Sequence, residues 1–90
     1  MTILHVAFGF SGPSIPIEKV QNALGKNAGW ARYAPNCWIV DTPESPADLA
    51  RRLHTLCKEG DSVFVCELNL RNNFGWLQKE LWDWINQRNR

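Results

Sequence analysis

The stretch CWIVDTPESPADLARRLHTL, residues 37–56, decides the fold, because it contains a strand, a helix start and a helix in succession. Residues 37–42 are rich in β-forming side chains, which predicts a strand. Ser45 stands three residues before Asp48, with Pro46 at the first helical position. This capping box is typical of a helix N-terminus, so the stretch predicts one strand followed by one helix.

The predicted helix continues as an apolar stripe through Leu49, Leu53 and Leu56, which share one face at helical spacing. Gly60 is placed to end this helix. Residues 63–68 then form a short run that is apolar on both faces. A strand of this kind is expected at the centre of a sheet.

Two further strands are expected before this stretch. Residues 30–34 form a short strand candidate, and the turn signal Pro35-Asn36 separates it from the strand at 37–42, so the two predict a hairpin. Residues 2–10 are mostly apolar, as in a strand that is covered on both faces.

A helix is expected between the first two strands. Ser14 or Ile15 would cap it, Pro16 would lie in its first turn, and Gly25 would stop it. Its apolar face would consist of Ile17, Val20 and Leu24.

The chain ends in an amphipathic pattern over about residues 75–88, in which Leu77, Leu81 and Ile85 recur every four positions. The resulting order is β-α-β-β-α-β followed by a helix, which is the split, ferredoxin-like pattern of the α+β class. We therefore expect one domain over residues 1–90, with two helices on one face of a four-stranded antiparallel sheet. Its second face needs cover from the terminal helix or from a second subunit.

Composition excludes several classes of protein. The net charge of the whole chain is only +1, so its overall charge does not indicate a nucleic-acid-binding protein. The three cysteines are odd in number and lack CxxC spacing, which argues against a disulfide framework and a zinc site. We expect Cys37 and Cys66 to be buried as small hydrophobic side chains. Free thiols of this kind suit the reducing conditions of the cytoplasm. Neither a signal peptide nor a membrane-spanning run is recognisable, so we expect a cytoplasmic protein without a membrane partner.

No motif predicts catalysis, a metal or a small-molecule cofactor. The loop at Gly9–Gly12 matches no phosphate-binding pattern and reads as a turn. His5 and His54 form no ligand pair. Asp41 and Glu67 fall on different strands and would make a cation site only if the fold brought them together.

Arginines and tryptophans are the remaining candidates for binding. Arginine beside aromatic rings can hold phosphates and stack on bases, although interleaved acids also suit an ordinary solvated surface. The nucleic-acid-binding candidates are Arg32, Arg51, Arg52 and Arg71. Tryptophan is enriched at interfaces but also fills small cores. The interface candidates are Trp30, Trp38, Trp76 and Trp82.

The pattern of residues 29–87 resembles the short SinR-like proteins, relatives of the small CRISPR-adaptation subunit and of VapD. The matching positions are Trp30, Tyr33, Trp38-Ile39-Val40, Thr42, Ser45, Leu49, Leu53, Asp61, Val65-Cys66-Glu67-Leu68, Gly75-Trp76-Leu77 and Trp82-Asp83-Trp84-Ile85. This resemblance implies a ferredoxin-like domain, a homodimer, and either a metal-dependent nuclease or a scaffold on nucleic acid.

The same resemblance implies an Asp at the end of the first strand, and the chain has Ala7-Phe8-Gly9-Phe10 there. Apolar side chains and glycine cannot ligate a hard cation. We therefore expect a non-catalytic, dimeric binding or scaffold module with a protein or nucleic-acid partner. The alternatives are a VapD-type metal-dependent endoribonuclease that uses Asp41 or Glu67, and a small inhibitor or immunity-type protein that blocks a partner.

Overall fold

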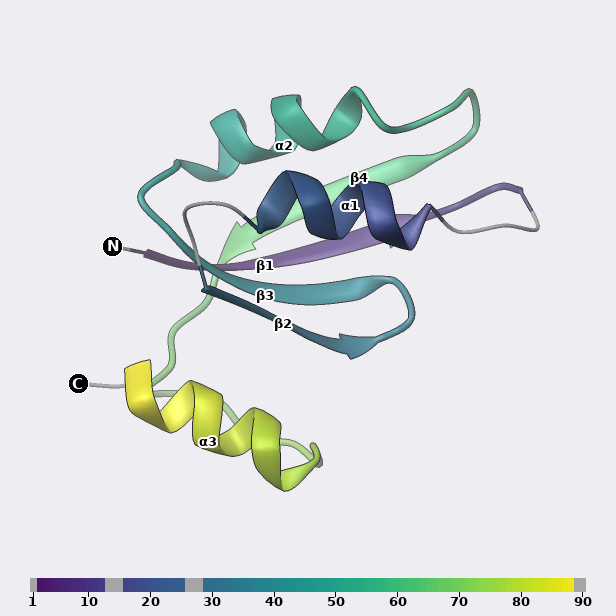
Figure 1. Cartoon of the computed structure of the whole chain (residues 1–90). Helices are drawn as coiled ribbons and strands as arrows, with labels where there is room; N and C mark the ends of the chain where they lie inside the picture. The colour runs from purple at the N-terminus through teal and green to yellow at the C-terminus, as the bar shows by residue number, and fades with distance from the viewer. Residues whose placement is uncertain (1, 13–15, 26–28, 89–90) are drawn as a thin grey trace.

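A computed structural model of the chain describes residues 2–12, 16–25 and 29–88. Its four strands form one sheet in the order β2-β3-β1-β4, and all neighbouring strands are antiparallel. The predicted ferredoxin-like α+β fold with a C-terminal helix is confirmed (Figure 1). The elements are β1 (Thr2–Gly9), α1 (Ile17–Leu24), β2 (Gly29–Ala34), β3 (Cys37–Thr42), α2 (Pro46–His54), β4 (Ser62–Glu67) and α3 (Lys79–Arg88).

The main core lies between the sheet and the helix pair α1 and α2, which cover one face of the sheet (Figure 1). Strand β1 sends Leu4, Val6 and Phe8 to this face, because alternate side chains of a strand point the same way. The helices complete the core with residues at helical spacing, and β3 adds a fully buried tryptophan. These residues are Val20, Leu24, Leu49, Leu53 and Trp38.

The second face of the sheet is partly covered by α3, which packs against β2 (Figure 1). Ile85 of α3 and Ile39 of β3 are both buried there. The sequence predicted that either the terminal helix or a second subunit would cover this face. The terminal helix therefore supplies part of that cover. The helix does not reach the β4 side of this face, where Phe64 remains 66% exposed.

Two predicted helix boundaries were wrong. The terminal helix begins at Lys79 rather than near residue 75. Helix α2 ends at His54, well before Gly60. The amides of Leu56 and Cys57 bond to carbonyls only three residues back, which tightens and closes the last turn. Gly60 serves the turn before β4 instead, with a φ of +89° that favours glycine.

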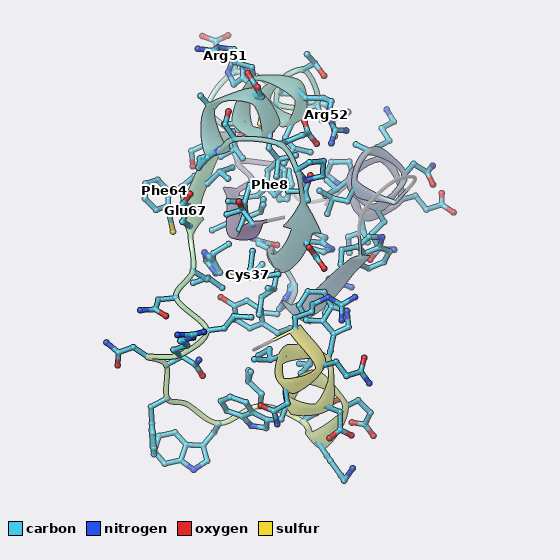
Figure 2. All side chains as sticks on the ribbon, turned by 90° about the vertical axis from the view of Figure 1, so that its left-hand side faces the viewer. Phe8, Cys37, Arg51, Arg52, Phe64 and Glu67 are labelled. Atoms are coloured by element: carbon cyan, nitrogen blue, oxygen red, sulfur yellow. The ribbon has the colours of Figure 1, made fainter. Side chains whose placement is uncertain are left out.

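The predicted central position of residues 63–68 was also wrong, because β4 is an edge strand. Its apolar residues nevertheless divide between the two faces. Val63 and Val65 pack on the main core, whereas Phe64 points to the second face (Figure 2). A strand with apolar side chains on both of its faces, such as β4, therefore need not lie between two other strands.

The predicted helix starts agree well with the structure. The Asp48 amide donates a hydrogen bond of 3.1 Å to Ser45 Oγ, and Pro46 occupies the first turn. Pro16 immediately precedes α1, and Gly25 follows its last residue. The cap proposed at Ser14 or Ile15 lies outside the described residues.

Candidate binding surface

The end of β1 is built from aromatic packing. The rings of Phe8 and Phe10 stack at 5.0 Å between centroids, and Phe8 also meets Trp38 edge-on at 5.7 Å. Phe8 is buried in the main core. At this strand end, where the resemblance implies a metal-binding Asp, the chain places a core side chain.

The loop after β1 is held by a carboxylate. The amide and the hydroxyl of Ser11 donate to Asp61 Oδ1, at 2.8 and 2.9 Å, and the Lys58 amide donates to Asp61 Oδ2 at 2.8 Å. The hydrogen bond from the Ser11 amide is the main reason why the pKa of Asp61 lies below its usual value. Among the described residues, Ser11 thus joins the β1 end to the turn before β4, as expected of a structural loop.

Asp41 and Glu67 do not form a common site. Asp41 stands opposite Ile3 in the register of β1 and β3, whereas Glu67 stands opposite Leu4 in the register of β1 and β4. Since Ile3 and Leu4 point to opposite faces of the sheet, the two carboxylates do so as well. Asp41 is engaged by Arg88 at 3.0 Å. No cluster of three or more potential metal ligands occurs within residues 2–12, 16–25 and 29–88.

Two of the predicted basic residues belong to α2, at the end of the molecule away from α3 (Figure 2). Arg52 forms an ion pair of 2.6 Å with Glu44 and also donates to the carbonyl of Ala23, so it fastens α2 to α1. Its hydrogen bond holds the pKa of Glu44 below the usual value. Arg51 is exposed and contacts Asp48 at 3.3 Å. Arg52 therefore has a structural role, and Arg51 lies apart from the remaining candidates.

Arg32 lies in a different setting, because it lines the same hollow as Trp76. The hollow has a volume of about 440 Å³ and is completed by Tyr33, Leu77, Gln78 and Leu81. The guanidinium of Arg32 donates to the Pro35 carbonyl at 3.0 and 3.2 Å. It forms no ion pair with a carboxylate in the described part of the chain.

An exposed aromatic pair stands beside this hollow. Phe74 and Trp76 are 79% and 89% exposed, and their rings meet edge to face with centroids 5.2 Å apart. Both belong to the segment between β4 and α3, which also carries Arg71. Large aromatic rings with this exposure are typical of contact sites for partners.

The other tryptophan candidates are less exposed. The prediction that Trp38 lies at an interface was wrong, because its side chain is fully buried between the sheet and the helices. Trp30 is half-buried and packs against the same core. Trp82 is half-buried and lines a cavity under α3. Only Trp76 is presented freely among the four.

A pair that was not predicted lies on the second face. His5 Nε2 and the Tyr33 hydroxyl share a hydrogen bond, and the two rings are 5.6 Å apart. Burial lowers the pKa of His5. Burial, followed by the nearby thiols of Cys37 and Cys66, raises the pKa of Tyr33 to about 12. The chain carries no local signal for this pair, because its members lie on non-adjacent strands.

Cys37, Cys57 and Cys66 are free, half-buried thiols, whereas Cys37 and Cys66 were expected to be buried. No helix in the described residues is long and apolar enough to cross a membrane. Comparisons of the chain with protein family models, with curated proteins and with solved structures found no match. The likeness to the SinR-like proteins therefore stays a prediction from the sequence.

Proposed function

We propose that the protein is a non-catalytic, dimeric binding module that holds single-stranded nucleic acid in the hollow between Arg32 and Trp76. The observation that carries this proposal is that Arg32, which has no carboxylate partner in the described residues, lines the same hollow as Trp76, the most exposed tryptophan. Proteins that bind single strands combine positive charge for the backbone with aromatic rings on which bases stack.

The geometry of the hollow supports a single strand rather than a duplex. Trp76 is 89% exposed, and Phe74 meets it at right angles, so most of the indole is accessible to a stacking base. Arg32 can reach a phosphate, and Gln78 adds an amide. Because only one arginine takes part, we expect weak binding that is sensitive to salt.

The placement of the carboxylates supports a non-catalytic role. The alternative ribonuclease would use Asp41 or Glu67. The strand register directs these two side chains to opposite faces, so one chain cannot hold an ion between them, and Asp41 is already paired with Arg88. The strand end that the family resemblance assigns to a metal-binding Asp carries buried Phe8 instead.

The proposed dimer rests on β4. This strand lies at the edge of the sheet, and Phe64 projects from it with 66% of its surface exposed (Figure 2). An edge strand with an exposed aromatic residue is a ready pairing surface for a second chain. A second copy would cover the part of the second face that α3 leaves open.

Fluorescence anisotropy with short labelled single-stranded RNA and DNA tests the nucleic-acid proposal. We expect saturable binding that Trp76→Ala and Arg32→Gln each weaken, because one removes stacking and the other a phosphate contact. The matched control is Arg51→Gln, which removes an exposed arginine on α2 and should leave binding unchanged. A binding affinity that does not change with salt concentration, or that Trp76→Ala leaves unchanged, would contradict the proposal. An absence of binding at low salt would also overturn it and favour a protein partner.

Incubation of the purified protein with RNA and DNA, with and without Mg²⁺ or Mn²⁺, tests the non-catalytic role. We expect no metal-dependent cleavage. Reproducible cleavage would refute the proposal, and its loss in Asp41→Ala or Glu67→Ala would point to the endoribonuclease.

Light scattering tests the dimer. At high micromolar concentration we expect a dimer that Phe64→Glu converts to a monomer, while Phe74→Glu, a second exposed aromatic residue, leaves it intact. A wild-type protein that remains monomeric would refute the proposed dimer, but it would have no bearing on the nucleic-acid proposal.

A further inference from the structure

The structure holds a second hollow, which the proposed function does not use. This cavity, of about 360 Å³, lies between the second face of the sheet, α3 and the segment that precedes α3. His5, Tyr33 and Ile39 of the sheet line it, as do Trp82 and Ile85 of α3. Its volume falls at the lower end of the ~300–1,000 Å³ that is usual for small-molecule sites.

The lining carries no charged residue, which restricts the charge of an occupant. It consists of aliphatic, aromatic and amide side chains, together with His5. Burial lowers the pKa of His5, so its ring is neutral at pH 7. A charged ligand would lose hydration here without gaining a counter-charge, which is costly. The cavity therefore favours an uncharged occupant.

The aromatic walls favour a flat occupant. Trp82 contributes from α3, Phe74 from the preceding segment, and Tyr33 from β2. Flat rings stack or meet edge-on with such walls and gain more than their buried area alone provides.

The polar groups favour an occupant with a hydrogen-bonding edge. The paired His5 and Tyr33 side chains line the cavity. His5 keeps its second ring nitrogen, Nδ1, and the Tyr33 oxygen can take part in more than one hydrogen bond. Two asparagine amides of the lining are partly engaged within their own segment, since Asn69 Oδ1 accepts from the Arg71 amide and Asn73 Nδ2 donates to the Leu70 carbonyl. Asn72 adds a third amide to the lining.

We propose that this cavity binds an uncharged, flat heteroaromatic ring of nucleobase size, stacked against Trp82 and hydrogen-bonded to the His5–Tyr33 pair. The ring can come from a free base or from a base of a bound single strand. Only the second source rests on the proposed function. Tyr33 lines this cavity and also the hollow of Arg32, so the two sites are neighbours.

Titration of the ¹⁵N-labelled protein with adenine, guanine, cytosine and uracil, followed by NMR, tests the proposal. We expect at least one free base to shift the Trp82 indole and His5 ring signals saturably. Trp82→Ala should weaken this binding about tenfold or more, and Tyr33→Phe should weaken it by removing the hydroxyl. The control Arg51→Gln, at an exposed side chain of α2 outside the cavity, should leave it unchanged.

A second arm uses short single-stranded oligonucleotides. If only an oligonucleotide shifts the Trp82 and His5 signals, the ring comes from the strand and the proposal holds. If neither free bases nor oligonucleotides shift them, or if the His5 shifts persist unweakened in both Trp82→Ala and Tyr33→Phe, the proposal is overturned. Free-base binding without oligonucleotide binding would instead retain the cavity site and refute the proposed function, so the two failures are distinguishable.

Discussion

Arg88 and Asp41 join the last turn of α3 to β3, with Arg88 Nε 3.0 Å from Asp41 Oδ2. The same guanidinium lies 3.9 Å from the centroid of the Trp84 ring and donates to the Trp84 carbonyl. It also rests against Gly29, where an added Cβ would lie 2.5 Å from Arg88 Nη2. This one side chain therefore links α3 to two strands of the sheet.

Arg88→Ala should lower the free energy of unfolding by about 1.5–3 kcal/mol, because it leaves a partly buried carboxylate without its charged donor. The matched control is Lys79→Ala, whose ion pair with Asp83 is largely exposed. That change should cost only about 0.3–0.5 kcal/mol. Urea unfolding followed by circular dichroism measures both, and equal losses would show that the Arg88 contact does not anchor the helix.

Phe8→Ala should cost about 3–5 kcal/mol of unfolding free energy, because it opens a cavity beside Trp38 in the main core. Phe74→Ala removes the same atoms from a ring that is 79% exposed, and should change stability by about 0.5 kcal/mol or less. Denaturant titration of the two variants checks this. A small loss for Phe8 would mean that the β1 end is not packed as described.

Ser11→Ala removes the hydroxyl that donates to Asp61 and should move the pKa of Asp61 upward, toward its usual value. The pKa is lowered in the folded state, so the carboxylate favours folding above the unfolded pKa of about 3.9, and this contribution is lost as pH falls through the folded value. NMR titration of the Asp61 side chain measures the shift. An unchanged pKa would mean that the backbone amides alone account for its lowering.

The His5–Tyr33 pair should make stability fall at both ends of the pH range. The folded pKa of His5 lies below its usual 6.5, so the unfolded chain takes up the proton first and stability drops as pH falls below about 6.5. The folded pKa of Tyr33 is about 12 against a usual 10.0, so stability drops as pH rises between these values. Unfolding measured across pH tests this, since His5→Gln should flatten the acid limb and Tyr33→Phe the alkaline limb.

Local signals predicted the elements well. Ser45 and Pro46 marked the start of α2, and the four-residue spacing of Leu49 and Leu53 identified its buried face. These features depend on neighbours a few positions away, so they can be read from the chain. The start of α3 and the end of α2 were predicted less well. The turn after His54 is closed by its own amide hydrogen bonds rather than by Gly60.

The candidate site depended on contacts that no local pattern describes. Arg32 and Trp76 line one hollow because the segment after β4 returns to the edge formed by β2. Trp38 and Trp76 were both interface candidates, yet one is fully buried and the other 89% exposed. Strand order also decided the place of β4, whose apolar faces alone suggested a central strand.

The attachment of α3 has a thermodynamic consequence. The helix packs mainly on β2, while the core formed by the sheet, α1 and α2 is built without it. Since Trp82 and Ile85 form one wall of the cavity, that wall is lost whenever the helix lifts away. Cavity occupancy and helix docking are therefore linked equilibria, and an occupant would slow amide hydrogen exchange in residues 79–88 more than in the sheet.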